Sequence, residues 1–393
     1  MPPLVLSSIL LSAPFVVGCG VRSAVRRTVA SRSRLFLQRG RPMKPHRFVP
    51  AALAALVTLT ACSDNPVAPS SNALSKTANS AAFARGGPNR SYTFTRLDVP
   101  GAFQTVPSGI NAEGLIVGWY FQGTGCPVAP CVVRGFTFDD GVFTTVVYHD
   151  ATLTNAAFTQ LRGVGPSGEI VGSYRMAGEP GVNAHGFILT KSGEFIPVNY
   201  PGHTNTIAQR ILPDGTILGC YHDGNQMASM HGMTKGRTGF SEINAFASMN
   251  NGATPGGRKV VGLFTDMAAG KGRAYLIEKG VFTPFDAPGS DFTAAWDISP
   301  NGTIVGLFED AAAPNQLHGY VLERGEFTTI DVPNSVYTDV FGINGSGDIV
   351  GKFRETATGP FHGYVATRRA GHGGEHDHDD TEGEDRGSSS STR

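Results

Sequence analysis

A glycine-punctuated unit recurs along this chain and restricts its fold more than any other feature. Between Asp291 and Pro333 the unit contains short runs of β-branched or aromatic residues, each bounded by Gly, Asn or Pro. Such runs predict strands that are joined by tight turns. The unit returns at intervals of about 45 residues, which indicates a repeat architecture. The glycine that ends its second strand stands at Gly118, Gly172, Gly219, Gly262, Gly306 and Gly351.

Each unit has room for four antiparallel strands, which matches one blade of a β-propeller. The last unit stops at His362 to Val365 without a fourth strand, whereas Phe94 to Gly101 resembles Phe327 to Pro333 almost residue for residue. If the first strand completes the last blade, the ring closes and exposed strand edges disappear. We therefore predict an all-β fold, a six-bladed β-propeller over residues 92–367. Its last blade is closed by the N-terminal strand Tyr92–Asp98, and His362 faces Asp98.

Charge gives no reason to expect nucleic acid as a partner. The 393 residues carry 32 Lys and Arg against 32 Asp and Glu, and charged residues make up 16% of the chain. Nucleic-acid-binding proteins usually carry a basic excess or patch. We expect no nucleic-acid partner, and we expect a monomer.

The N-terminal region predicts export with a lipid anchor. Met43 opens a segment with a basic start and an apolar core that ends at Leu59-Thr60-Ala61-Cys62, and this resembles a bacterial lipoprotein signal. The rival ending Val16 to Cys19 has no Lys or Arg before it. The apolar core is too short to favour a membrane span. Ser63 after the lipidated Cys62 is typical of sorting to the outer membrane.

The chain therefore divides into five expected segments. They are an over-extended start (1–42), a signal peptide (43–61), a disordered tether rich in Ser, Asn and Pro (62–91), the propeller (92–367) and a disordered tail (368–393).

Three cysteines fall within the expected propeller. Cys126 and Cys131 flank a short loop, and in an exported protein this spacing predicts a disulfide. A zinc site is the alternative, but it needs more ligands than the loop supplies. Cys220 lies inside a strand and is expected to be a small core residue.

A basic residue begins the third strand of every unit, and we call this set the third-strand column: Arg134, His185, His231, Arg273, His318 and His362. Repeated His invites a metal or catalytic interpretation. Hairpin geometry favours a structural one, because turn lengths place a carboxylate or amide opposite most members. The expected cross-strand pairs are His185–Asn199, His231–Asn244, Arg273–Asp286, His318–Asp331 and His362–Asp98. Arg134 faces Val147 and has no such partner.

Two further sets are candidates for a ligand face. Asp223, Asp266, Asp310 and Glu355 each follow the aromatic residue of a second strand, and they would surround one mouth of the ring. A divalent cation is one ligand for such oxygens, although solvated loop acids or partners of the nearby His and Arg fit better. On the inner strands, Arg210 and Asp297 interrupt the glycines of what we call the axial column: Gly109, Gly163, Arg210, Gly252, Asp297 and Gly342. They could form a site or simply pair with each other.

The repeat resembles the HAF family of extracellular repeats through Gly342 to Gly351 and His318-Gly319-Tyr320. Gly186, Gly319 and Gly363 replace the Ala of the triplet that names the family. The resemblance implies an exported repeat protein and brings no activity, cofactor or functional residue with it.

The C-terminal tail carries His372, His376 and His378 among acidic residues. It could chelate Zn²⁺, Ni²⁺ or Cu²⁺ loosely. Because nothing rigid holds these ligands, a solubilising tail is the favoured interpretation.

Two functions remain open from the sequence. The first is a lipid-anchored binding or scaffold module that presents its loops to a protein or glycan, with no cofactor and no catalytic residue. The second is a hydrolase or lactonase-like enzyme with its site in the channel. No nucleophile or zinc-binding motif supports the second, so we favour the first.

Overall fold

Short antiparallel strands follow one another along nearly the whole described chain. The computed structural model describes residues 73–74, 91–123, 132–180, 183–224 and 229–369, which lie within one compact unit, Pro69–Arg393. These residues contain no α-helix.

The strands of the first half are β1 (Ala73–Leu74), β2 (Tyr92–Arg96), β3 (Ala102–Ile110), β4 (Ile116–Gln122), β5 (Val132–Asp139), β6 (Val142–Val146), β7 (Phe158–Val164), β8 (Ile170–Arg175), β9 (His185–Leu189), β10 (Phe195–Val198), β11 (Asn205–Ile211) and β12 (Ile217–His222). Those of the second half are β13 (His231–Gly236), β14 (Gly239–Ala253), β15 (Lys259–Asp266), β16 (Lys271–Glu278), β17 (Val281–Phe285), β18 (Ser290–Ile298), β19 (Ile304–Asp310), β20 (Leu317–Glu323), β21 (Glu326–Ile330), β22 (Tyr337–Ile343), β23 (Ile349–Arg354) and β24 (His362–Arg368).

Pairing groups these strands into antiparallel sets of four. The sets are β3–β6, β7–β10, β11–β14, β14–β17, β18–β21, and β22–β24 with β2. The long strand β14 serves two sets in succession. Single parallel bridges, Val133 with Phe158 and Leu317 with Tyr337, join other neighbouring sets, so the strands connect into three larger sheets.

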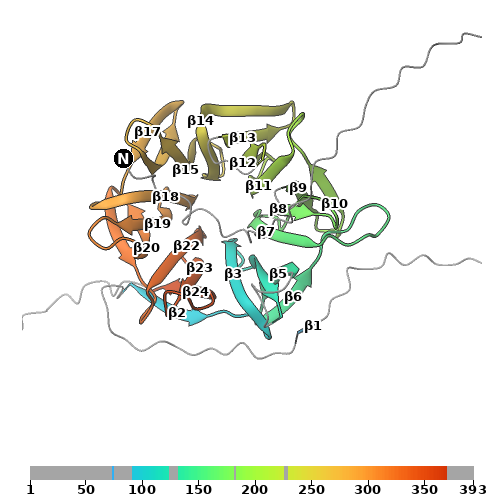
Figure 1. The fold of residues 1–393 in the computed structure, drawn as a ribbon, viewed down its shortest axis with the longest axis horizontal. Coiled ribbons are helices and arrows are strands. Elements are labelled where there is room, and N and C mark those ends of the chain that lie inside the picture. Colours follow the sequence, from blue (N-terminus) through green and yellow to red (C-terminus); the bar gives the residue numbers. More distant parts are fainter. Residues whose placement is uncertain (1–72, 75–90, 124–131, 181–182, 225–228, 370–393) are drawn as a thin grey trace, which may run out of the picture. The chain divides into compact units, whose positions relative to one another are not determined.

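The sets surround a common axis (Figure 1). The inner strands β3, β7, β11, β14, β18 and β22 contact one another in that order, and β22 contacts β3. Strand β2 pairs with β24 from Tyr92 opposite Arg368 to Arg96 opposite Tyr364. The predicted pairing of the first and last strands is therefore confirmed, and the all-β propeller is the class of fold that this chain adopts.

Turn chemistry explains the hairpins. Arg324 and Gly325 between β20 and β21 have φ of 53° and 87°, and Lys279 and Gly280 between β16 and β17 have 53° and 77°. Positive φ at both central residues is the conformation of a tight hairpin turn whose twist matches that of the strands. It sets the predicted register, since Glu323 lies opposite Glu326.

A glycine on the second strand makes room for a large side chain on the third. Tyr320 is fully buried and lies opposite Gly306, and Tyr275 lies opposite Gly262 in the same way. A Cβ on Gly306 would overlap the Ala294 carbonyl oxygen and come 2.9 Å from the Tyr320 ring. The recurring glycines found in the sequence therefore mark close approach of three strands. The equivalent pairs elsewhere are Gly118–Phe136, Gly172–Phe187, Gly219–Met233 and Gly351–Tyr364.

On five inner strands, a threonine hydroxyl fixes the segment that enters the strand. Thr293 Oγ1 accepts a hydrogen bond from the Ala287 N–H at 3.1 Å, and Thr338 Oγ1 accepts one from the Val332 N–H at 3.1 Å. Each bond satisfies a buried backbone donor in the connection between two sets of strands. Thr105, Thr159 and Thr206 do the same for Val99, Tyr148 and Tyr200, and Ser248 bonds to the Gly232 N–H.

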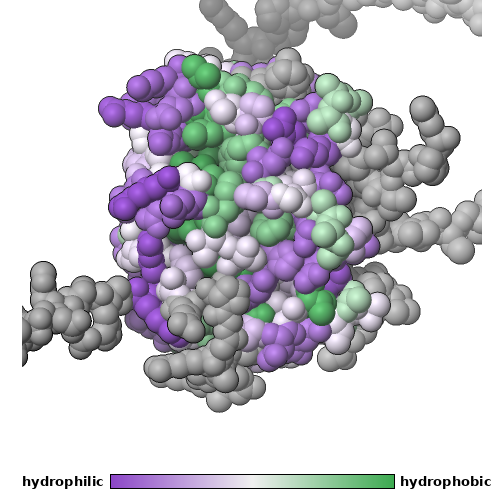
Figure 2. Space-filling view, turned by 90° about the vertical axis from the view of Figure 1, so that its left-hand side faces the viewer, coloured by the Kyte–Doolittle hydropathy of each residue, from purple (hydrophilic) through white to green (hydrophobic). Residues whose placement is uncertain are grey.

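The outer side of the ring has a mixed surface. Figure 2 shows one side, where polar side chains alternate with a band of apolar surface. Strand β1, which falls in the segment predicted to be a tether, pairs with β6 through Ala73 opposite Thr144. Among the described residues no helix is long and apolar enough to span a membrane.

Candidate functional site

The third-strand column meets carboxylates in most sets of strands. His318 Nδ1 lies 2.8 Å from Asp331 Oδ1, and His362 Nδ1 lies 2.9 Å from Asp98 Oδ2. The hydrogen bond with Asp331 raises the pKa of His318, although burial opposes it. The structure thus brings together two of the pairs expected from hairpin geometry.

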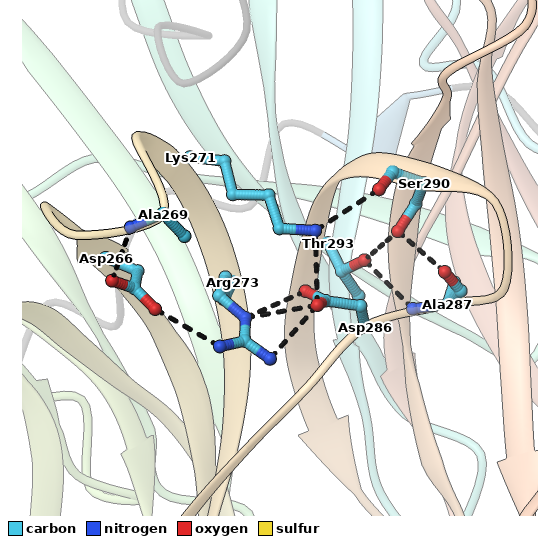
Figure 3. A network of polar contacts seen from close by, with 8 residues as sticks. All are labelled: Asp266, Ala269, Lys271, Arg273, Asp286, Ala287, Ser290 and Thr293. Atoms are coloured by element: carbon cyan, nitrogen blue, oxygen red, sulfur yellow. Dashed lines mark hydrogen bonds and ion pairs between the residues drawn. The ribbon is translucent and has the colours of Figure 1, made fainter.

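Arg273 lies between two carboxylates (Figure 3). Its Nε donates to both carboxylate oxygens of Asp286 at 3.1 Å, and its Nη1 donates to Asp266 Oδ2 at 3.1 Å. Lys271 Nζ lies 3.1 Å from Asp286 Oδ2. A hydrogen bond from the Ala269 N–H lowers the pKa of Asp266, and the bond from Arg273 lowers this pKa too. These charges satisfy one another, as expected of a structural network.

Two expected partners are replaced by glutamates. The β9–β10 register still points Asn199 toward His185, but His185 Nε2 lies 2.9 Å from Glu179 Oε1 in the preceding loop. His231 lies opposite Ala247 because a bulge shifts the β13–β14 register, so it does not face Asn244. Its Nδ1 instead lies 2.6 Å from Glu242 Oε1. The register of β9 with β10 thus agrees with the predicted opposition of His185 and Asn199, although Glu179 makes the contact. The predicted opposition of His231 and Asn244 is wrong, because turn length alone does not reveal a bulge.

Two other positions complete the column. Arg134 Nη1 donates to the Ala156 carbonyl at 2.9 Å, in place of a cross-strand acid. Asp98 also accepts from Arg96 Nε at 2.6 Å and from the Gly363 N–H at 3.1 Å. Burial raises the pKa of Asp98, but the bonds from His362 and Arg96 outweigh it and the pKa is lowered.

Three of the four acids after the second strands contact nearby basic groups, and the fourth, Asp310, accepts from the main chain. Asp223 Oδ2 lies 2.9 Å from His203 Nδ1, and Glu355 Oε1 lies 3.6 Å from Arg96 Nη1. Asp266 bonds to Arg273, and Asp310 accepts from the Ala312 N–H at 2.8 Å. Over the described part of the chain, no group of three or more His, Cys, Asp or Glu side chains is placed to hold a metal ion.

Arg210 and Asp297 meet at the axis. Arg210 Nη2 lies 3.3 Å from Asp297 Oδ2, and both side chains are nearly buried. The guanidinium also donates to main-chain carbonyls of separate inner strands: Arg162 on β7 at 2.8 Å, Gln209 on β11 at 2.8 Å, Ser108 on β3 at 3.2 Å and Phe341 on β22 at 2.7 Å. Asp297 accepts from the N–H groups of Ile298 and Ile343 at 2.9 and 3.3 Å, and burial raises its pKa.

The glycines of the axial column leave space for this arrangement. A Cβ on Gly163 would lie 3.2 Å from Arg210 Cα, and one on Gly252 would lie 2.8 Å from Asp297 Oδ1. The interruptions noted in the sequence and the surrounding glycines therefore form one feature, in which a charged pair ties the inner strands together around the axis.

A second buried group of charges was not predicted from the sequence. Asp339 and Lys352 are opposite each other on β22 and β23, and they are 1% and 3% exposed. Burial raises the pKa of Asp339 to about 6 and lowers the pKa of Lys352 to about 8. Trp296 Nε1 on β18 donates to Asp339 Oδ1 at 2.8 Å.

A sequence signal for this group existed. The positions equivalent to Lys352 carry Leu263 and Leu307, and those equivalent to Asp339 carry Met249 and Ala294. Ser173 and Gln160 stand at these positions in the second unit, so Lys352 and Asp339 are the charged members of otherwise uncharged columns, just as Arg210 and Asp297 are the charged members of a glycine column.

Cys220 is a buried free thiol, and burial raises its pKa to about 12. It agrees with the expected core role. Cys62, Cys126, Cys131, His372, His376 and His378 lie outside the described residues.

Comparison with known proteins adds resemblances in fold. The chain is similar to a gluconolactonase from Xanthomonas campestris, with 11% identity, a TM-score of 0.44, and coverage of 71% of this chain and 90% of the other. It is similar to TolB from Acinetobacter baumannii, with 12% identity, a TM-score of 0.43, and coverage of 64% and 63%. A third structure is the β-propeller domain of the Trilobed protease from Pyrococcus furiosus, with 9% identity, a TM-score of 0.41, and coverage of 67% and 95%.

No protein-family model and no curated protein sequence matches the chain. The resemblance to HAF repeats therefore stays a prediction, and at such low identities no activity passes from the solved structures to this protein.

Proposed function

We propose that this protein is a six-bladed β-propeller of the HAF type that acts as a binding or scaffold module. Support for the blade count comes from the inner strands β3, β7, β11, β14, β18 and β22, each of which begins a set of four strands or, in β14, continues into one. The ligand, a protein or a glycan, binds the loops of one ring face, and the module works as a monomer without a cofactor.

The observation that carries this proposal is that the charged side chains at the axis of the ring, Arg210 and Asp297, already have partners within the protein. The Arg210 guanidinium donates hydrogen bonds to carbonyls of four inner strands and forms an ion pair with the Asp297 carboxylate. A channel enzyme needs a concave site with polar groups that converge on the substrate. Here the groups of the axial column converge on one another, so the loop faces are the better binding surface.

We infer further that the module is exported and held at the outer membrane by lipid on Cys62. The support is the sequence Leu59 to Cys62 at the end of an apolar segment. In cells fed a labelled fatty acid, the full chain is expected to carry label and to partition into detergent, whereas Cys62→Ser should do neither. Label that persists in Cys62→Ser would refute the anchor.

One observation favours the alternative, a hydrolase or lactonase-like enzyme. Asp339 and Lys352 are a buried acid and base with shifted pKa values, which is common at catalytic sites. Structural ion pairs show such shifts as well, so this remains the second candidate.

A paired assay separates the two functions. The purified full chain is screened on a glycan array and, in parallel, with a panel of lactones and esters. Saturable glycan binding without turnover, unchanged in Lys352→Met, supports the binding module. Turnover of a lactone or ester that Lys352→Met abolishes would overturn it in favour of the enzyme.

A further inference from the structure

The ring has two faces that carry different kinds of connection. Because the strands of each set are antiparallel, the connections after second and fourth strands lie at one face. We call it the long-loop face, and it includes the β6–β7 connection, residues 147–157. The connections after first and third strands lie at the other face, the turn face, which includes the two-residue turns at Lys279-Gly280 and Arg324-Gly325.

The chain enters and leaves the ring at the turn face. Tyr92 begins β2 opposite Arg368 of β24, and the Arg368 N–H donates at 3.0 Å to Asp348 Oδ1, in the turn between β22 and β23. The Arg369 N–H donates to the Ser91 carbonyl at 2.9 Å. The residues before and after the ring are therefore attached at the turn face, and the long-loop face points away from both points of attachment.

One connection of the long-loop face is longer than its equivalents. The threonine hydroxyl that fixes the connection accepts from a residue 6 positions earlier in four sets of strands, but from Tyr148, 11 positions earlier, after β6. The β6–β7 connection is thus five residues longer (11 − 6). An insertion in one repeat commonly carries function, because the shared scaffold does not need it. The four shorter connections turn at a Gly or Asn with positive φ: Gly101, Gly202, Gly289 and Asn334.

The additional residues belong to a small hairpin, residues 149–155, which we call the insert hairpin. An antiparallel bridge joins its first and last residues. Asp150 Oδ1 accepts from the N–H groups of Thr152 and Thr154, each at 2.9 Å, and the Asp150 N–H donates to the Thr154 carbonyl at 3.1 Å. These bonds hold the tip in one conformation.

Leu153 stands at the tip in a conformation that is unfavourable for leucine. Its φ is 61°, and of the six non-glycine residues with positive φ in the described part of the chain it alone has an apolar side chain. A bulky residue in this left-handed region is strained. The side chain is also 73% exposed, so no packing within the chain offsets the strain. Such a leucine on a fixed tip indicates a contact that forms only with a partner.

The chemistry of the insert hairpin favours a protein partner over a membrane or a glycan. A membrane surface with anionic lipids attracts Lys and Arg, but the hairpin has neither and contains Asp150. Sugar hydroxyls need hydrogen-bond donors or acceptors, which a leucine side chain lacks. An apolar pocket of a folded protein, in contrast, gains stability by removing an exposed leucine from water.

We propose that the insert hairpin anchors a folded protein partner to the long-loop face, with Leu153 seated in an apolar pocket of that partner. This inference rests on the proposed binding function. It adds the face that binds, the residue that anchors the contact and the class of ligand.

Photocrosslinking in cells that produce the full chain tests the contact. p-Benzoylphenylalanine is placed at position 153 or, as a control, at position 281, where Val281 is 63% exposed and follows a turn of the turn face. We expect a discrete protein adduct from position 153 and none from position 281. The protein identified in that adduct is then purified and titrated against the purified full chain. Leu153→Gly should weaken its affinity by at least about tenfold, and Val281→Ala should leave it unchanged.

Leu153→Gly also separates binding from folding, because glycine adopts positive φ without strain. Its Tm should rise by about 1–3 °C. A fall in Tm would assign Leu153 to the structure and overturn the inference. No adduct at position 153, adducts at both positions, or an unchanged affinity of Leu153→Gly would overturn it as well. Saturable glycan binding without an adduct at position 153 would do so and leave the proposed binding function intact, whereas absence of both would count against both.

Discussion

The single side chain of Arg210 connects four inner strands at the centre of the ring. Where neighbouring units have glycine, its guanidinium bonds to main-chain oxygens of four strands and pairs with Asp297. A planar group with five donors suits this position, and Lys could not reproduce it.

Breaking the axial pair should be strongly destabilising. Arg210→Met leaves Asp297 buried without its cation, and we expect a loss of about 3–5 kcal/mol in the free energy of unfolding in urea. The double variant Arg210→Met with Asp297→Leu should recover part of that loss, because no charge then stays unpaired. A loss below about 1 kcal/mol in the single variant would show that water replaces the pair.

His318 should make stability depend on pH. Its pKa is raised in the folded state by the bond with Asp331, so the folded protein holds this proton more tightly than the unfolded chain. The stabilisation is full below the unfolded pKa of about 6.5, and it is lost as pH rises through the folded pKa. Between about pH 5.5 and 8.5, urea unfolding of the wild type should lose on the order of 1 kcal/mol more than His318→Gln. Identical slopes in both proteins would contradict the assignment.

At the scale of strands, regular features could be read from the sequence and local exceptions could not. Two-residue turns set the register of Arg273 with Asp286 and of His318 with Asp331, because their geometry depends on neighbouring residues alone. The bulge at His231 and the loop acid at Glu179 depend on tertiary contacts, and they replaced two expected partners. Lys352 and Asp339 stand out in the sequence as charged members of uncharged columns, but strand alternation does not say which polar face becomes buried.

Gly306 tests the close packing of three strands. Gly306→Ala places a Cβ against the Ala294 carbonyl and the Tyr320 ring, and we expect a loss of at least about 2 kcal/mol in the free energy of unfolding. Gly236→Ala is the matched control, because a Cβ there meets nothing within 4 Å and should change stability by less than about 0.5 kcal/mol. Equal melting temperatures for the two variants would count against the packing argument.

At the scale of the whole molecule, stability depends on a contact between distant parts of the chain. Phe94 on β2 is buried in one core cluster with Phe353 and Tyr364, and Asp98 bonds to His362 next to it. The resemblance between the first strand and Phe327 to Pro333 made this closure predictable. The interior charges Arg210 and Asp297 were predictable as interruptions of a glycine column, but the strand pattern, which is common to every unit, did not show which main-chain groups they would contact.

The closing strand should contribute far more through its apolar side chains than through its charge. Phe94→Ala is expected to lose about 3–5 kcal/mol in urea unfolding, since it opens a cavity in the core. Asp98→Ala should lose on the order of 1 kcal/mol, because it removes one cross-strand pair. Comparable losses in both variants would mean that the pair, and not the packing, holds the strand.

The pairing of β2 with β24 also determines when folding can finish during synthesis. A ribosome makes β2 before every other strand of the ring and its partner β24 after all of them. The edge that β2 will cover, and the edge of β2 itself, stay open until Arg368 has been made. Contacts of such long sequence separation slow folding, and unpaired strands favour aggregation. The time during which the nascent chain can aggregate therefore depends on how fast β24 is made and pairs with β2. A holding chaperone that binds extended strands would protect the chain until then.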